Sequence, residues 1–424
     1  MKLYIVKKII SIYVFYLNTF NTRNKKTKEI KIAFFNTHDK GGGAARICNQ
    51  LFDTFQNSIM FVKNKRQISD RIIEFDSDLW NRLGHYAREI ERKKGILDFG
   101  KIGVLKLLSN INYQNASIIH LHNIHGYYFS IYALEKIVLK KRIIWTLHDE
   151  FIMTGHCSSS FNCNKWKIGC GNCPSLNVYP SLKTDTTQIN LKEKISTIKK
   201  IKPYIVTPSK WLADRIQLQF PFLKNIEVIY NGVDNEVFKP YDKIKTRLEL
   251  GIPLDKKIVL FVAEFSTLNP FKGGDIIREI IANSAFFDVN FITIGGNNET
   301  YYQNHLSYPY ISNDIDLAKL YAACDVLLYP TQADNMPLVV LESMACGTPV
   351  IASKLGGIPE VIRESNGLLI EDYKNTHAFE DGLNHFLSLS NSKVEELRNN
   401  AVFTIKERFT ITQMVSAYQR IYQL

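Results

Sequence analysis

Residues 334–353, DNMPLVVLESMACGTPVIAS, hold the local pattern that decides the fold. Asn335 is a good capping residue and Pro337 suits the first turn of a helix, where a missing N–H costs nothing. Apolar residues then follow at helical spacing until Gly347, which ends the predicted helix. Residues 350–352 predict a buried strand, and a helix that runs straight into a buried strand is typical of parallel α/β architecture.

Two carboxylates bracket the start of this helix. Asp334 is expected directly before the positive helix N-terminus, and Glu342 about two turns into the helix, on a neighbouring face. Backbone N–H groups at a helix start favour negative charge. The stretch therefore predicts an anion-binding site between two polar side chains.

The same alternation of apolar runs and amphipathic stretches extends along the chain from residue 31. The first series of predicted strands includes residues 31–37, 117–122 and 142–148, and the second series includes 257–265 and 325–330. Two similar series predict two Rossmann-like, doubly wound domains that face each other across a cleft. Ligands of such sheets bind outside the carboxyl ends of the strands.

The net charge of +12 over 424 residues is uneven, since half of it lies in residues 1–30. This segment also contains IISIYVFYL at 9–17, which is shorter than the roughly 20 apolar residues needed to cross a bilayer. It could bind an anionic membrane surface. The alternatives are a poorly ordered extension, a start codon assigned too early, or a signal peptide, although no small-residue cleavage site follows.

Two glycine-rich turns could hold phosphate groups. GGGAAR at 41–46 follows a predicted strand and opens a helix, so Gly42 and Gly43 would let the backbone approach a ligand closely. A tight turn alone would explain these glycines equally well. In the second half, Lys272 precedes Gly273-Gly274 at another helix start, where an ammonium group suits a diphosphate. A surface lysine is the alternative.

Histidines gather after two predicted strands of the first half. HLHNIHGYY contains His120, His122 and His125, and TLHDE contains His148 and Asp149. A metal site is one reading of the first group, although His120 and His122 share one face of a predicted strand and no carboxylate partner is evident. His148 ends a hydrophobic strand, so we expect a functional role for its side chain in the crevice, with packing against the loop as the alternative.

Seven cysteines are present, and four of them lie within GHCSSSFNCNKWKIGCGNCPSL at 155–176. Their number and density suit a tetrahedral structural zinc ion in a reducing compartment, with free thiols or disulfides as the alternatives. The predicted ligands are Cys157, Cys163, Cys170 and Cys173. The other three cysteines lie in apolar helical contexts and are expected to be small core residues.

Together these residues resemble a known family, the retaining family 4 or group 1 glycosyltransferases, which have the GT-B fold. The likeness covers about residues 31–415 and rests on a D-x7-E form of the family's E-x7-E signature, followed by ACGTPVIAS. GGGAAR, IVTPSKWLADRI, IYNGVD and LGGIPEVI appear in family order around it. WTLHDEFIMTGHC with GCGNCP is most similar to bacterial transferases of the colanic-acid and exopolysaccharide type.

The resemblance implies a role for each matching residue. Glu342 would hold the nucleotide ribose, Lys272 would neutralise the diphosphate, and His148 would contact the donor sugar near the reacting carbon. Gly42 and Gly43 would approach the diphosphate from the other domain. The remaining donor-binding residues would be Asp334, Asn335, Met336, Pro337 and Leu338. Many members carry an Arg before the Lys, where this chain has Glu264 nearby, so Arg46 is a candidate for the compensating cation.

The resemblance also implies a domain plan. It comprises the extension 1–30, an acceptor domain 31–207 with the cysteine-rich loop 155–176, a donor domain 208–405, and a C-terminal helix 406–424 that packs back toward the first domain.

The implied activity is that of a hexosyltransferase, which moves a sugar from a nucleotide-diphosphate sugar to a hydroxyl with retention at the anomeric carbon. His148, Asp334 and Lys272 would act in the reaction, without a catalytic metal. The expected partners are the nucleotide sugar, an oligosaccharide or lipid-linked glycan acceptor, and an anionic membrane surface, with no nucleic acid. We expect a cytoplasmic protein, at the inner face of the plasma membrane if it binds lipid.

Two other functions fit parts of the sequence. The chain could be a sugar-nucleotide-binding scaffold that has lost turnover, since Asp334 replaces the usual Glu and the Arg is missing. It could also be a basic, zinc-containing nucleic-acid binder, which would bind with a steep dependence on salt.

Overall fold

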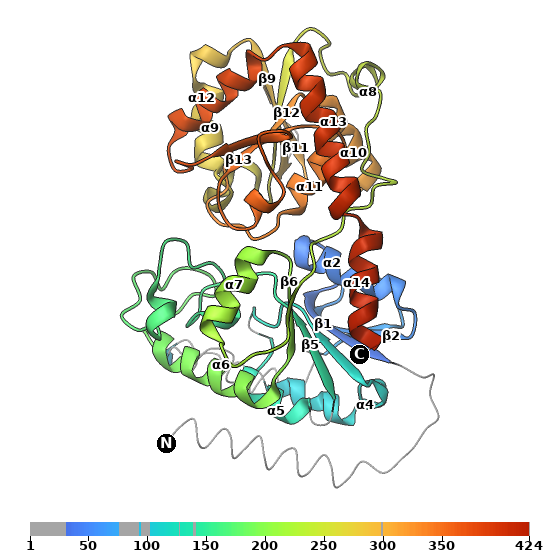
Figure 1. Cartoon of the computed structure of the whole chain (residues 1–424), viewed down its shortest axis with the longest axis vertical. Coiled ribbons are helices and arrows are strands. Elements are labelled where there is room, and N and C mark those ends of the chain that lie inside the picture. Colours follow the sequence, from blue (N-terminus) through green and yellow to red (C-terminus); the bar gives the residue numbers. More distant parts are fainter. Residues whose placement is uncertain are drawn as a thin grey trace. The chain divides into compact units, whose positions relative to one another are not determined.

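The computed structural model describes residues 31–75, 93–94, 102–126, 128–138, 141–297 and 300–423. The chain divides into two compact units (Figure 1). The first runs to Ile229 and includes Ile421–Leu424, and the second is Tyr230–Arg420. The basic extension 1–30, with its predicted membrane-surface segment, lies outside the described residues.

The first unit contains a seven-stranded parallel sheet in the order β3-β2-β1-β4-β5-β6-β7. The strand order reverses between β1 and β4, which places a switch point at their carboxyl ends. The strands are β1 (Ile32–His38), β2 (Ser58–Asn64), β3 (Ile72–Glu74), β4 (Ile118–Leu121), β5 (Arg142–Thr146), β6 (Tyr204–Thr207) and β7 (Ile226–Val228).

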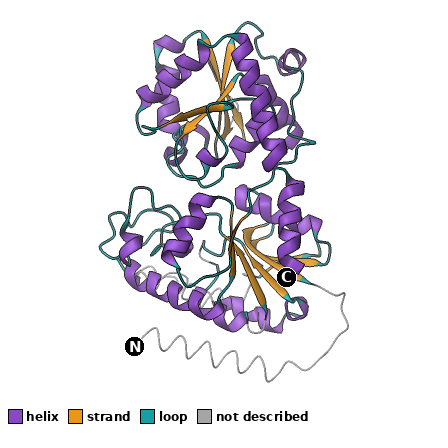
Figure 2. Cartoon of the chain, viewed as in Figure 1, coloured by secondary structure: helices purple, strands orange, loops and turns teal. Residues whose placement is uncertain are grey.

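Helices cover both faces of this sheet, as in a doubly wound fold (Figure 2). The α-helices are α2 (Gly43–Thr54), α4 (Ile111–Asn115), α5 (Ile131–Ile137), α6 (Thr187–Ile201) and α7 (Lys210–Gln219). Short 3-10 helices occupy Ile102–Ser109, Phe151–Met153 and Lys165–Ile168.

The second unit has a seven-stranded sheet in the order β10-β11-β9-β8-β12-β13-β14. Its pairs are parallel except for the β10–β11 hairpin at one edge. The switch point lies between β8 and β12. The strands are β8 (Lys257–Val262), β9 (Val289–Gly296), β10 (Thr300–Tyr302), β11 (His305–Pro309), β12 (Val326–Tyr329), β13 (Val350–Ser353) and β14 (Gly367–Ile370).

Helices also flank this second sheet (Figure 2). They are α8 (Lys243–Leu250), α9 (Gly274–Ala282), α10 (Asp314–Ala323), α11 (Leu338–Ala345), α12 (Thr376–Leu387) and α13 (Asn391–Arg408), with 3-10 turns at Ser266–Leu268, Pro270–Lys272, Ser284–Phe286 and Ile358–Glu360. The last helix, α14 (Ile411–Gln423), follows α13. Ile421–Gln423 of α14 belong to the first unit, where the Tyr422 hydroxyl bonds His120 Nδ1 at 2.6 Å.

Each sheet is the centre of its own hydrophobic core. Phe35 and Trp145 are buried in the first core, and Leu328 and Ile351 in the second. Central strands such as β12 and β13 are buried at every residue, because helices cover both faces of a parallel sheet. The short apolar runs that predicted buried strands therefore form the central strands of the sheets.

Two boundaries differ from the sequence predictions. The first unit extends past residue 207, because β7 pairs with β6 and completes the first sheet rather than opening the second. Helix α11 begins at Leu338 with Pro337 as its cap, so Asn335 is not the capping residue and Glu342 lies one turn into the helix instead of two.

The predicted core cysteines Cys48, Cys324 and Cys346 are fully buried, which confirms that prediction. Among the described residues, no helix combines the length and apolar character that crossing a bilayer requires.

Candidate functional site

The switch point of the second sheet brings two loops together. One loop follows β8 and contains Lys272, and the other follows β12 and contains Asp334. Because β8 and β12 are parallel neighbours, both loops leave the sheet at the same edge. This is the edge at which open α/β sheets bind ligands.

An ion pair joins these loops. Lys272 Nζ donates to Asp334 Oδ2, and the Tyr329 hydroxyl donates to the same oxygen at 2.6 Å. The second carboxylate oxygen accepts from the backbone N–H of Asn335 at 3.0 Å. Burial raises the pKa of Tyr329 well above its usual value, and the Asp334 carboxylate adds to the rise, so the phenol keeps its proton. The Lys272 and Asp334 side chains remain partly exposed, at 30% and 16%, and can meet a ligand.

Gly273 allows the close approach of the two loops. Its φ is +79°, and a Cβ at this position would lie 2.0 Å from the carbonyl oxygen of Pro330. Next to it, the Phe271 carbonyl accepts from the Gln332 N–H at 2.9 Å and from the Thr331 hydroxyl at 3.2 Å. The backbone therefore holds Lys272 beside the segment that leads to Asp334.

The segment from Asp334 to Pro337 is also held from its other sides. A Cβ on Gly356 would lie 2.0 Å from the Asp334 carbonyl oxygen, so only glycine fits there. The Gly357 N–H donates to the Asn335 carbonyl at 2.7 Å, and the Asn231 amide donates to the Met336 carbonyl at 2.9 Å. The motifs LGGIPEVI and IYNGVD thus support the loop that carries Asp334.

Helix starts add backbone donors at this edge. Helix α9 begins directly after Gly273 and α11 directly after Pro337, and neither cap residue supplies a side-chain acceptor. First-turn N–H groups without intrahelical partners favour an anion. Glu342 on α11 is buried at 4% exposure and accepts a hydrogen bond from the Tyr321 hydroxyl at 3.2 Å.

In the first unit, Gly42 is the cap of α2 and Gly43 its first residue. Gly42 has φ +77°, and its missing Cβ would point into open space, so the turn is accessible to a ligand. The fully buried Asp39 carboxylate holds this loop, because it accepts the backbone N–H groups of Arg66 and Gln67 at 2.7 to 3.0 Å.

The histidines of the first unit form a connected group. His122 Nδ1 and His148 Nε2 are 2.9 Å apart, so the two imidazoles share a hydrogen bond. His120 lies against His122, with ring centroids 4.3 Å apart, and its Nε2 is 2.8 Å from the Thr146 hydroxyl. His120 and His122 thus share one face, as the sequence predicted.

Burial keeps this group neutral. It lowers the pKa of His148 to about 4 and those of His120 and His122 well below the usual histidine value. His122 is 1% exposed, and its Nε2 has no hydrogen-bond partner. Beside the group, His125 Nε2 bonds the Asp149 carboxylate at 2.6 Å. A neutral His148 can donate or accept a hydrogen bond at pH 7, but it cannot supply positive charge.

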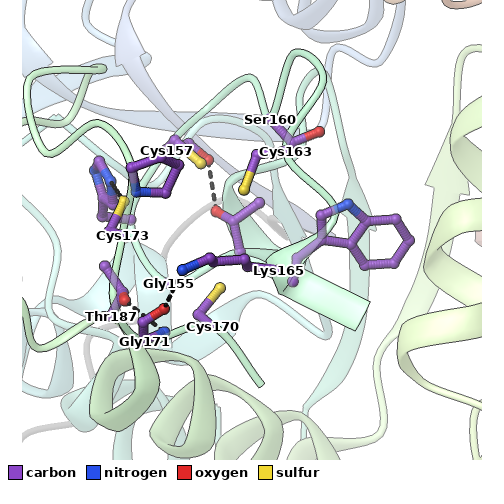
Figure 3. Close-up of a pocket in the computed structure, with 13 residues that line it drawn as sticks. Gly155, Cys157, Ser160, Cys163, Lys165, Cys170, Gly171, Cys173 and Thr187 are labelled. Atoms are coloured by element: carbon purple, nitrogen blue, oxygen red, sulfur yellow. Dashed lines mark hydrogen bonds between the residues drawn. The ribbon is translucent and has the colours of Figure 1, made fainter. Parts of the chain in front are cut away.

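The four clustered cysteines line one cavity of about 20 Å³, together with His156 and Lys165 (Figure 3). All four are free thiols. Burial raises the pKa of Cys157 to about 12 and also raises the pKa values of Cys170 and Cys173. The Lys194 ammonium opposes this rise at Cys157 and Cys170.

Across the part of the chain that the structure describes, no three His, Cys, Asp or Glu side chains are already placed to hold a metal ion. This applies to the histidine group and, in the conformation described, to the cysteines. The zinc site therefore stays a prediction.

The structure joins some of the predicted residues and adds others. It pairs Lys272 with Asp334. It places Gly42 after β1 and His148 after β5, at the same carboxyl edge of the first sheet, with β4 between these two strands. Sequence reasoning missed Tyr329 and the bond from His122 to His148. The only available signal for Tyr329 was its place as the last residue of a buried strand.

Comparison with known proteins gives a family match for part of the chain. Residues 242–402, which include Lys272, Asp334 and Glu342, match the family described as glycosyl transferases group 1. The matched segment lies within the second unit, and the predicted resemblance to group 1 is confirmed.

Two curated relatives extend the likeness. WcaC of Escherichia coli K12, named for glycosyl transfer in colanic acid biosynthesis, is 26% identical over 268 residues, which cover 60% of this chain and 64% of WcaC. The D-inositol 3-phosphate glycosyltransferase of Mycobacterium bovis BCG is 30% identical over 180 residues, 39% of this chain and 36% of the relative. The matches thus span less than two thirds of either relative.

Solved structures show the fold. Sucrose-phosphate synthase from Thermosynechococcus elongatus has a TM-score of 0.65 at 16% identity and covers 93% of this chain and 98% of its own. HepE of Anabaena, solved with UDP and glucose, has a TM-score of 0.64 at 16% identity, and the match covers 93% of this chain and 99% of HepE. The GT-B class with two Rossmann-like doubly wound domains is confirmed.

Proposed function

We propose that the second unit binds a nucleoside-diphosphate sugar and that the chain transfers the sugar to a hydroxyl acceptor. The observation that carries the proposal is the placement of Lys272 and Asp334 at the switch point of the second sheet, beside two helix starts. A diphosphate needs cationic and N–H donors, and this edge offers both.

The donor would form contacts along this edge. Lys272 would bind the diphosphate, with backbone N–H groups from the loop Asp334 to Leu338, and Glu342 would accept the ribose hydroxyls. Binding a ribose would require Glu342 to exchange its bond with Tyr321, because its carboxylate is buried. UDP is the first nucleotide to test, since HepE was solved with UDP.

The proposed chemistry rests on charge. When the glycosidic bond breaks, negative charge grows on the departing diphosphate, and Lys272 stabilises that charge more than it stabilises the intact donor. Asp334 fixes the ammonium through the ion pair before the donor arrives. No catalytic divalent ion is part of this scheme, and a zinc ion at the cysteines would be structural.

Other parts of the proposal rest on the resemblance. They are retention at the anomeric carbon, membership of family 4, contact of His148 with the donor sugar, and approach of Gly42 and Gly43 to the diphosphate. The likeness to WcaC supports a role in bacterial cell-surface polysaccharide synthesis, with a glycan acceptor and a cytoplasmic or peripheral membrane location.

Turnover assays on the full chain test the proposal. A panel of nucleotide sugars is first screened for protection against thermal unfolding, because a ligand that binds only the native state raises its stability. The donor that protects is then assayed for hydrolysis and transfer, with Glu342→Ala as the inactive comparison. Protection without hydrolysis or transfer to any acceptor would favour the scaffold function instead.

A further inference from the structure

We propose that Cys157, Cys163, Cys170 and Cys173 bind one zinc ion, and that this ion orders the loop that follows His148. The four thiols come from separate points of the chain between β5 and α6, yet they line one small cavity (Figure 3). Four cysteine sulfurs around a shared space are a standard structural zinc set.

The cavity has room for a single ion. Its volume of about 20 Å³ is close to that of one water-sized sphere. The sulfurs do not yet stand at coordination distances, so binding requires the thiol groups to turn inward.

The Nε2 atom of His156 faces this cluster as a hydrogen-bond acceptor. Its Nδ1 is 2.8 Å from the carbonyl oxygen of Pro180, which can only accept, so Nδ1 carries the proton. In the neutral ring Nε2 is then an acceptor, and it faces Cys173 Sγ at 3.5 Å. His156 Nε2 therefore accepts a hydrogen bond from the Cys173 thiol.

Two lysines lie near the cluster, and the carboxylates of Glu150 and Asp185 also act on its thiols. A zinc ion with four thiolates has a net charge of −2, which would be costly to bury alone. Lys194 is 2% exposed and donates to the carbonyls of Phe151 and Thr154 at 2.6 and 3.1 Å. Lys165 lines the cavity and donates to the Asn172 carbonyl.

The cluster also connects to the functional loop of the first unit. Lys194 reaches from α6 to the carbonyl of Phe151, which lies three residues after His148. On the other side, the N–H groups of Gly171 and Cys173 donate to Thr187 at 2.9 Å and to Asp185 at 2.6 Å. A metal that fixes the cysteines would therefore fix the segment after β5 against the start of α6.

The test measures metal content and stability of the full chain, purified in reducing buffer without added metal. We expect about one zinc ion per chain by elemental analysis, because four thiolates complete the tetrahedral shell. Cys170→Ala should lose the zinc, whereas Cys346→Ala, at a buried cysteine of the other unit, should keep it. A chelator should lower the melting temperature of the wild-type chain but not that of zinc-free Cys170→Ala.

The outcomes separate the alternatives even if Cys170→Ala folds poorly, because wild-type chain is sufficient for the decisive measurements. Zinc-free wild-type protein with seven titratable thiols, and no rise in melting temperature on adding zinc, would overturn the proposal. Disulfides among the four cysteines, detected by mass spectrometry of the chain as isolated, would overturn it as well. Neither result depends on sugar transfer, so the proposed function would stand.

Discussion

Lys272 donates to Asp334 across the switch point of the second sheet, 62 positions further along the chain. The pair holds an ammonium group at a fixed place, but it also neutralises that group before a ligand binds. An incoming diphosphate must therefore share Lys272 with the carboxylate. This competition leads to two opposite predictions for the two side chains.

Replacement of Lys272 by alanine should lower kcat/KM for the donor by about 10²-fold, since it removes a cation that acts on developing charge. Nucleoside-diphosphate binding, measured by calorimetry, should also weaken. Lys319→Ala is the matched control, because Lys319 on α10 forms a partly exposed ion pair with Glu249 on α8 of the same unit. Equal effects of the two substitutions would argue against a specific role for Lys272.

The substitution Asp334→Asn should act in two directions. It leaves Lys272 without its competing anion, so UDP should bind about tenfold more tightly, which corresponds to roughly 1.4 kcal/mol. Transfer should nevertheless slow, because the ammonium loses the carboxylate that positions it. Calorimetry and steady-state kinetics measure the two effects, and weaker UDP binding would contradict the competition.

Replacing Gly273 with alanine should disrupt the junction between the two loops. The new Cβ would lie 2.0 Å from a backbone oxygen and would have to push the β12 loop away, with loss of donor binding. Gly251→Ala is the control, since Gly251 also has a positive φ of 65° but nothing within 4 Å of a Cβ. The control should cost about 1 kcal/mol of unfolding free energy and leave donor binding intact. Similar donor affinities for the two variants would show that the close approach is dispensable.

The sequence predicted the features that depend on local pattern. Buried runs such as residues 350–352 became central strands, and the glycine turns at Gly42 and Gly273 open helices as expected. Site residues at strand ends were also predictable, because a polar residue directly after a buried strand falls at the binding edge of a parallel sheet.

Features that depend on distant partners could not be predicted in this way. The β10–β11 hairpin was missed because its sequence is polar and short, and β7 was assigned to the wrong sheet because a three-residue strand carries no signal for its neighbour. Likewise, no local pattern indicates the hydrogen bond between His122 and His148, because the two residues lie 26 positions apart. Such pairs follow from strand order, which no local pattern specifies.

Mild acid should destabilise the first unit through its buried histidines. An unfolded histidine has a pKa near 6.5, whereas burial lowers the pKa of His148 to about 4 and lowers those of His120 and His122 as well. Between these two pH values the unfolded chain binds more protons than the folded chain. The stability that the neutral histidines contribute is therefore fully present above pH 6.5 and is lost as the pH falls toward 4. In this range each such histidine lowers the free energy of unfolding by up to about 1.4 kcal/mol for every pH unit.

Urea unfolding followed by tryptophan fluorescence measures this loss, because all four tryptophans precede residue 230. We expect the free energy of unfolding to fall between pH 7 and 5, where most carboxylates stay ionised. His122→Phe should make the fall shallower, while His377→Gln on α12 should not change it. A free energy that stays constant over this range would contradict the neutral, buried state of the group.

The central claim is that the carboxyl edge of the second sheet binds a nucleoside diphosphate through Lys272. A crystal structure of the full chain, soaked with UDP or with whichever nucleoside diphosphate most raises the melting temperature, tests it most directly. We predict a phosphate oxygen within hydrogen-bond distance of Lys272 Nζ and a ribose hydroxyl on Glu342. A nucleotide bound at any other edge of the chain, with the Lys272–Asp334 pair untouched, would contradict the account.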